Sequence, residues 1–323
     1  MAYPLLFFCA LIGWSQAFLS IPSLDVEGLT HADITEEALL EVVMDACREE
    51  AQNNGRTFNP PALLNPESLL RACLGVLEDA DLSASKFREL LNEIITENIF
   101  IDRDQAFSSA HHFNDEAIEK GRDIITQGVS IVKASLQQGN LEAARRALGA
   151  VTHTLQDFYS HSNWFELGNL DPYPNLLRPD LPLQNIADEN TPTCNDCQEK
   201  VCPNVILPEI LRTNTLTSGY LISTPQGKCY HGDSTRGGIS KDFGDDLTPD
   251  GTDPHLAAYS TATQATKDLL QNIRITFGNT VFLRSLPNDI AEVQRLTAKI
   301  IDNTRGTPNE PSLYILIVFN DLG

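Results

Sequence analysis

The sequence has little positive charge and no long apolar run after its first residues, and both shortages limit what the chain does. Its 323 residues hold 23 Lys and Arg against 44 Asp and Glu, a formal net charge of −21. Affinity for nucleic acid depends on Lys and Arg contacts to phosphates, so we expect no nucleic-acid partner. Beyond residue 17 no segment approaches the roughly 20 apolar residues of a membrane-spanning helix, so we expect no transmembrane segment.

The first residues, MAYPLLFFCALIGWSQA, do contain a short apolar run at 4–14, followed by the small residues Ser15 and Ala17. This pattern is typical of a secretory signal peptide, although no basic residue precedes the apolar core. We therefore predict a signal peptide over residues 1–17 and a secreted, extracellular protein.

Removal of residues 1–17 leaves an even number of cysteines, which favours disulfides in an oxidising compartment. Cys47 and Cys73 lie in neighbouring helical patterns and are a natural candidate pair. The remaining four fall in one Cys-rich stretch: Cys194, Cys197, Cys202 and Cys229. Disulfides are the favoured interpretation there, and zinc held by four thiolates is the alternative.

Apolar residues recur at helical spacing over most of the first 168 residues. The pattern predicts helices at 35–53, 66–79, 85–99, 115–138 and 140–167, the first capped by Thr35 and the last by Asn140. Residues 168–253 are rich in Pro, Gly, Asn and Asp and show no sustained period. A stretch of this length inside a compact domain is expected to be functional or covalently braced.

Helical spacing returns at 254–277, with Asp253 as the cap and Pro254 as the first helical residue, and again at 287–306. The segment SLYILIVFND at 312–321 is typical of a buried strand. The predicted fold class is therefore mainly α. We expect one helical domain over 18–278 with a Cys-rich loop at 190–232, followed by an α/β segment at 279–323.

The stretch THTLQDFYSHSNWFELG places His153, Asp157 and His161 four residues apart, on one face of a helix. Imidazole and carboxylate are standard zinc ligands, and the aromatic residues around them indicate a buried face where charges need partners or metal. The first and third positions lie about 12 Å apart, too far to share one ion, so Asp157 bridging two ions fits better. The alternative is a polar stripe of hydrogen-bonded core residues.

The same stretch resembles the signature helix of the zinc-dependent phospholipase C and P1 nuclease superfamily, in the branch of the fungal heterokaryon-incompatibility proteins. It is more similar still to the N-terminal region of a vertebrate family of proteins that contain von Willebrand A domains. The segments THADITEEAL, CNDCQEKVC, GGISKD and RGTPNEPSLYILIVFND resemble that family in the same order. The resemblance implies a zinc phospholipase C-like helical domain and then a partial von Willebrand A domain.

The metal motif of a von Willebrand A domain, Asp-x-Ser-x-Ser, is expected between FLRSL and PNDIAEVQRL, where this chain has no residues for it. The match at 81–85 is interpreted as chance, because helical sequence flanks it on both sides. We therefore expect a fragment or a splice product that lacks this motif.

Members of the superfamily bind up to three zinc ions through His, Asp and the mature N-terminus. The resemblance assigns the following residues to metal: His31, His112, His153, Asp157, His161, His255, Asp102 or Asp104 upstream of His112, and Phe18 as the first mature residue. Tyr259 stands where the enzymes have Glu, which puts a complete catalytic site in doubt. His111 and His231 are interpreted as structural.

Three functions are consistent with these patterns. The favoured one is an extracellular binding or matrix-type protein whose zinc is structural, because the pattern departs from that of the enzymes. The second is a zinc-dependent phosphodiester hydrolase that acts on phospholipid head groups. The third is a helical domain whose histidines bind nothing. An extracellular protein or a phospholipid is the expected partner, and no catalytic residue is assigned.

Overall fold

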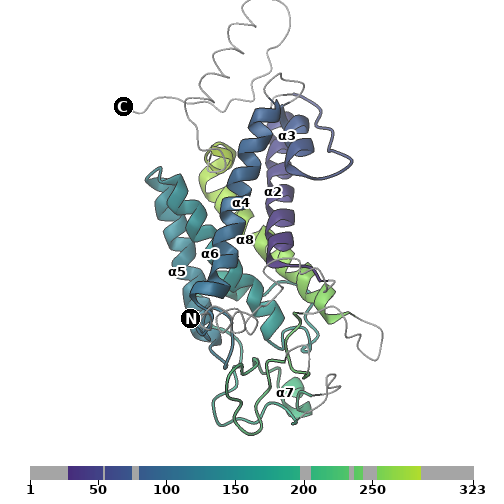
Figure 1. Cartoon of the computed structure of the whole chain (residues 1–323), viewed down its shortest axis with the longest axis vertical. Helices are drawn as coiled ribbons and strands as arrows, with labels where there is room; N and C mark the ends of the chain where they lie inside the picture. The colour runs from purple at the N-terminus through teal and green to yellow at the C-terminus, as the bar shows by residue number, and fades with distance from the viewer. Residues whose placement is uncertain are drawn as a thin grey trace, which may run out of the picture. The chain divides into compact units, whose positions relative to one another are not determined.

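A computed structural model describes residues 28–53, 55–74, 80–196, 205–232, 236–242 and 253–284 (Figure 1). These residues are mainly helical, as predicted, and contain isolated β-bridges but no named strand. The elements, in chain order, are α2 (His31–Asn53), α3 (Pro66–Leu74), α4 (Ala80–Asp104), α5 (Ile118–Gln137), α6 (Leu141–His161), η2 (Pro174–Leu177), α7 (Pro208–Arg212) and α8 (Pro254–Arg284).

The chain divides into two compact units. The first is made of residues up to Thr35, Ile95–Ile131 and Ala147–Thr266, and the second of Glu36–Ile94, Val132–Arg146 and Lys267 onward. The second unit has an apolar core that includes Leu39 and Leu91, and the predicted Cys47–Cys73 disulfide is confirmed there, with Cα atoms 5.4 Å apart. The first unit contains the polar residues that carry the site.

Helix α2 begins at His31, four residues before the predicted start, and Thr30 rather than Thr35 precedes it as the cap. The Thr30 amide and hydroxyl donate to Asp33 Oδ2 at 2.8 and 2.6 Å, and the Asp33 amide donates back to Thr30 Oγ1 at 3.2 Å. This is the reciprocal pattern of a capping box, in which the two residues satisfy each other's amides. Its consequence is that His31 occupies the first helical position and Thr35 lies buried one turn later.

The two other predicted caps are confirmed. Asn140 Oδ1 accepts from the Ala143 amide at 3.2 Å before α6, and Asp253 Oδ1 accepts from the Leu256 amide at 3.2 Å before α8. The predicted end of α6 at residue 167 is wrong, because the helix ends at His161.

The side chain of Asn163 explains why α6 stops. Its amide nitrogen donates to the Thr215 carbonyl at 2.9 Å, and its amide oxygen accepts from the Thr217 backbone at 2.9 Å. This pairing requires the chain after His161 to run beside residues 215–217 instead of continuing the helix.

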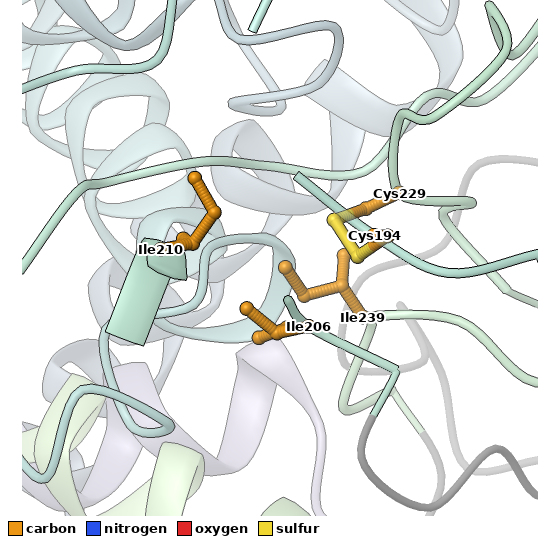
Figure 2. Packing of buried hydrophobic residues seen from close by; sticks show 5 residues of the cluster. All are labelled: Cys194, Ile206, Ile210, Cys229 and Ile239. Atoms are coloured by element: carbon orange, nitrogen blue, oxygen red, sulfur yellow. A yellow bond between two sulfur atoms is a disulfide. The ribbon is translucent and has the colours of Figure 1, made fainter. Parts of the chain in front are cut away.

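Between α6 and α8 the described residues hold only η2 and α7, as expected for the stretch without periodicity. Cys194 and Cys229 form a disulfide that packs with Ile206, Ile210 and Ile239 in a small buried apolar cluster (Figure 2). Because this disulfide consumes two of the four thiols, the zinc–thiolate alternative is wrong.

Several predicted features lie outside the described residues. They are the signal peptide at 1–17, Phe18, Cys197, Cys202, the helix at 287–306 and the strand at 312–321. Among the described helices, none combines the length and the apolar character that crossing a bilayer requires.

Candidate metal centre

Helix α6 carries His153, Asp157 and His161 along one face, and all three side chains are buried. Asp157 Oδ2 lies 3.2 Å from His153 Nε2 and 4.0 Å from His161 Nδ1. The four-residue spacing therefore places the carboxylate between the two imidazoles, as a helix with 3.6 residues per turn requires.

Three more side chains converge on Asp157 from other elements. His31 comes from the first residue of α2, and its Nε2 lies 3.1 Å from Asp157 Oδ1. His112 comes from the loop after α4, and its Nδ1 lies 2.8 Å from Asp157 Oδ2. Asp102 comes from the last turn of α4, and its Oδ1 lies 3.6 Å from His153 Nε2. We call His31, Asp102, His112, His153 and Asp157 the Asp157 cluster.

The Asp157 cluster contains two sets of donors close enough to share an ion. One set is His31, His153 and Asp157, and the other is Asp102, His112 and His153, each with its ligand atoms within 4.8 Å of one another. His153 Nε2 and His112 Nδ1 lie only 3.3 Å apart. Such convergence of nitrogens and carboxylate oxygens is the arrangement in which zinc is bound in proteins.

A separate group of possible metal ligands consists of His161, His231 and Asp242, and we call it the Asp242 group. His161 Nε2 lies 3.2 Å from Asp242 Oδ1, and His231 Nε2 lies 3.9 Å from Asp242 Oδ2. The hydroxyls of Ser160 and Ser240 donate to the Asp242 carboxylate at 2.5 and 2.8 Å, so its orientation is constrained from both sides.

In each of five histidines one ring nitrogen faces an acceptor other than the Asp102, Asp157 and Asp242 carboxylates. His31 Nδ1 faces the Gln156 amide oxygen at 2.7 Å, and His153 Nδ1 faces the Asn98 amide oxygen at 3.2 Å. Backbone carbonyls accept from the other three: Gln105 from His112 Nε2 at 3.1 Å, His112 from His161 Nδ1 at 2.6 Å, and Gly232 from His231 Nδ1 at 2.7 Å. An outer acceptor of this kind decides which nitrogen carries the proton, so the opposite nitrogen, facing Asp157 or Asp242, is available as a ligand atom.

The electrostatics of the Asp242 group follow from burial and from its carboxylates. Burial lowers the pKa of His161, but Asp242 and Asp157 outweigh burial and raise it to about 9. Burial, with the neighbouring His161, lowers the pKa of His231 to about 4. Burial raises the pKa of Asp157, yet His153 and His161 hold it well below its usual range. The Asp157 and Asp242 carboxylates are therefore ionised at neutral pH, and His161 carries a proton that an incoming cation would displace.

Two of the predicted ligands lie outside both sets of donors. Asp104 is about half exposed and pairs with Arg103 at 2.6 Å. Asp102, on the same helix, belongs to the Asp157 cluster instead. His255 uses both ring nitrogens elsewhere: Nδ1 donates to the Lys241 carbonyl at 2.7 Å, and Nε2 accepts from the Leu29 amide at 2.9 Å. His255 therefore has no ring nitrogen directed to the Asp157 cluster or the Asp242 group. Tyr259, on α8, is buried.

Sequence reasoning missed His231 and Asp242. Neither residue has a helical partner at four-residue spacing, so no periodic pattern marks them. A signal was nevertheless present, because the segment GGISKD, which carries the family resemblance, ends in Asp242. Close backbone packing explains two glycines near His231. A Cβ on Gly238, within that segment, would lie 2.3 Å from the His231 carbonyl oxygen, and one on Gly219, outside it, would lie 2.6 Å from His231 Cα.

The loop that carries His112 is held in an unusual conformation. Phe113, Asp115 and Glu116 have positive φ angles of 50°, 55° and 58°, which cost free energy in residues other than glycine. The Glu116 side chain is only 5% exposed and accepts from Lys228 Nζ at 2.6 Å. Because Lys228 directly precedes Cys229, this ion pair joins the His112 loop to the disulfide-braced segment that leads to His231.

Comparison with known proteins places this chain in a family. A family model described as the VWA7 N-terminal domain matches residues 64–283. The chain belongs to this family. The matched stretch of the VWA7 N-terminal domain contains every member of the Asp157 cluster and the Asp242 group except His31.

Curated relatives agree with this assignment. The chain is 33% identical to von Willebrand factor A domain-containing protein 7 of Homo sapiens over 333 residues and 31% identical to that of Mus musculus over 326 residues. Both alignments cover 91% of this chain but 36% of the relative, so the chain spans about a third of the relatives' length. No solved structure shows significant similarity to the chain.

Proposed function

We propose that this VWA7 N-terminal domain is a zinc-binding module of a secreted protein, in which the metal stabilises the fold and the protein acts by binding other molecules. The observation that carries the proposal is that the two nitrogens of each of five imidazole rings face different partners. One nitrogen of each donates outward, and the other is directed to Asp157 or Asp242.

The donor set fits zinc. Imidazole nitrogens and carboxylates are ligands that zinc accepts in tetrahedral sites. His231 Nε2 is buried and makes no hydrogen bond among the described residues, and it lies 3.9 Å from Asp242 Oδ2. A buried polar atom without a hydrogen bond costs free energy, and a cation bound by His231 and Asp242 would remove that cost.

Burial favours a structural role over catalysis. Every member of the Asp157 cluster and the Asp242 group is buried, with exposed fractions between 0% and 8%. A catalytic zinc keeps a coordination position open to substrate, whereas a structural zinc is closed. A domain with closed sites is expected to contribute stability and a binding surface rather than turnover.

A second candidate is zinc-dependent phosphodiester hydrolysis, as in the zinc phospholipase C and P1 nuclease superfamily. One observation favours it: Asp157 lies within 4.0 Å of four histidines. Two of these histidines are on α6 and two come from other elements. A carboxylate shared between ions is a feature of two-metal hydrolases, which clamp the attacking and leaving oxygens.

Secretion is supported by the two disulfides of the described residues, because disulfides form and persist in oxidising compartments. The signal-peptide pattern of residues 1–17 agrees with it. We propose that residues 279–323 are part of a von Willebrand A domain, as the resemblance implies.

Elemental analysis of the purified protein tests the zinc proposal. We expect at least one zinc per chain in the wild type and loss of zinc in His153→Ala and Asp157→Ala. His255→Asn is the matched control, because it removes a buried histidine whose two nitrogens are already hydrogen-bonded, and it should keep wild-type zinc content. Fewer than about 0.2 zinc per chain in the wild type would contradict the proposal.

Turnover of a chromogenic phosphodiester separates the two roles. A structural zinc predicts no hydrolysis above the protein-free rate, with unfolding when a chelator removes the metal. Hydrolysis that is abolished both by the chelator and by Asp157→Asn would establish the hydrolase instead.

A further inference from the structure

A buried polar network lies behind the two histidines that face Asp157 from helices α2 and α6. It links four helices within the first unit, and its members are all at most 1% exposed: Thr35 on α2, Asn98 on α4, Thr152 and Gln156 on α6, and Thr266 on α8. Since these side chains are buried from solvent, their hydrogen-bond directions are set largely by one another.

In this network two threonine hydroxyls donate to backbone carbonyls. The Thr152 hydroxyl donates to the Gly149 carbonyl at 2.8 Å, and the Thr266 hydroxyl donates to the Ala262 carbonyl at 2.8 Å. A hydroxyl has a single proton, so with that proton used its oxygen is left only as an acceptor.

These threonine oxygens require an NH2 group opposite them. Asn98 Nδ2 donates to Thr152 Oγ1 at 3.1 Å, and Gln156 Nε2 donates to Thr266 Oγ1 at 3.3 Å. Both amides also donate to Thr35 Oγ1, at 3.2 and 3.1 Å. Reversing either amide would set an amide oxygen against an acceptor, so the two orientations are fixed.

With the nitrogens so placed, the amide oxygens face the histidines. Asn98 Oδ1 lies 3.2 Å from His153 Nδ1, and Gln156 Oε1 lies 2.7 Å from His31 Nδ1. An amide oxygen only accepts, so Nδ1 of each ring carries the proton. In the neutral ring, Nε2 is then the atom with the lone pair, and it is the atom that faces Asp157.

The opposite arrangement would make an ordinary core. If the amides were reversed, each Nδ1 would accept, and each Nε2–H would donate to the Asp157 carboxylate in a buried hydrogen bond that needs no ion. The direction of the threonine and amide hydrogen bonds therefore decides between a hydrogen-bonded His–Asp core and a set of metal ligands.

We propose that Thr152 and Thr266, acting through Asn98 and Gln156, hold His153 and His31 in the Nδ1–H tautomer and reserve both Nε2 atoms for a metal ion. They are positioning residues that touch no ligand atom of the ion. The proposal rests on the zinc-binding function proposed above and adds what prepares the ligands for it.

The test compares Thr→Val with Thr→Ser at both threonines. Val is similar in shape but offers no oxygen, whereas Ser keeps the hydroxyl and removes a methyl group. We expect the double variant Thr152→Val/Thr266→Val to bind zinc about 10- to 100-fold more weakly in competition with a chelator, as for other residues that orient metal ligands. The Thr152→Ser/Thr266→Ser variant should stay within about threefold of wild type. Equal zinc affinity in the valine and wild-type proteins would overturn the proposal.

Ring nitrogen resonances of 15N-histidine-labelled protein supply a readout that a packing defect would not move. Wild-type protein should show His31 and His153 protonated at Nδ1 and bound or unprotonated at Nε2 at alkaline pH, and the valine variant should lose this preference. Nε2–H in the wild type would contradict the proposal. If the wild type binds no zinc, the zinc function fails, while the tautomers of the metal-free protein still decide on the network.

Asn98→Leu offers a second variant should the valine protein fail to fold. Leu is similar in size to Asn but removes both the NH2 group that faces the threonine oxygens and the acceptor that faces His153 Nδ1. The variant should bind zinc more weakly and lose the Nδ1–H signal of His153, and an Asn98→Leu protein that keeps both would overturn the proposal.

Discussion

The Asp157 cluster and the Asp242 group use the same donors, imidazole and carboxylate, but the chain positions them by different means. In the Asp157 cluster four of the five residues project from helices, and helix geometry brings them together. In the Asp242 group, two of the three residues lie on irregular chain between α7 and α8, close to the Cys194–Cys229 disulfide. A helix carries its own positional information, whereas an irregular segment needs covalent and tertiary braces to hold a ligand in place.

The two sets of donors share helix α6, so one substitution should damage both. Asp157→Asn removes the charge opposite His31, His112 and His153 and lies 4.0 Å from His161. We expect loss of zinc from the Asp157 cluster by more than about 100-fold in affinity and weaker binding at the Asp242 group. Zinc content and chelator competition measure both. An Asp157→Asn protein with wild-type zinc content would show that the clusters do not depend on this carboxylate.

Removing the Cys194–Cys229 disulfide should affect the Asp242 group but not the Asp157 cluster. The Cys194→Ser/Cys229→Ser variant frees the segment that carries His231, so we expect it to lose zinc from the Asp242 group while the Asp157 cluster keeps its own. Cys47→Ser/Cys73→Ser is the control, since that disulfide lies in the other unit. It should lower stability by roughly 2–4 kcal/mol without changing zinc content. Equal zinc content in the two variants would contradict the assigned role of the brace.

The pH dependence should also distinguish the Asp242 group. Its His161 has a pKa raised to about 9 by neighbouring carboxylates, so below that pH zinc must displace one proton. His231, with a pKa lowered to about 4, is already neutral at pH 7. Zinc affinity of this group should therefore rise about tenfold per pH unit from pH 7 to 9 and level off above. Chelator competition at pH 7, 8 and 9 measures the slope, and a flat profile would argue that His161 is not a ligand.

The smallest effects should come from two neighbouring carboxylates on α4. Asp102→Asn should weaken zinc binding at the Asp157 cluster about tenfold, because Asp102 faces His153 and His112. Asp104→Asn should change it less than about twofold, because Asp104 is paired with Arg103 at the surface. The same chelator competition compares them, and a larger effect at Asp104 would reverse the assignment.

The Asp157 cluster and the Asp242 group also differ in how far the sequence predicts them. The four-residue spacing of His153, Asp157 and His161 is a local property of a helix, so the sequence alone predicted that they share one face. His231 and Asp242 meet His161 through the disulfide, the Gly238 contact and the serines on Asp242, none of which leaves a periodic trace. Tertiary packing supplies that information, and a single sequence does not contain it in readable form.

One local error has a physical explanation. The sequence predicts that α2 starts at Thr35, but the capping box of Thr30 and Asp33 makes it start at His31. The family pattern assigns His255 to metal, whereas in the structure the Leu29 amide and the Lys241 carbonyl are the partners of its ring nitrogens. Residue type and order along the chain do not reveal such backbone partners.

The capping box of α2 also fixes the directions in which the side chains of this helix point. Each residue of a helix turns the side chain by about 100°, so a start one residue earlier or later would swing His31 away from Asp157 and Thr35 away from the two amides. His31 and Thr35 are four residues apart and must face the same way, one toward a ligand position and the other toward the network behind it. Two hydrogen-bonded residues at the helix entrance thus set the angle at which a whole helix presents both.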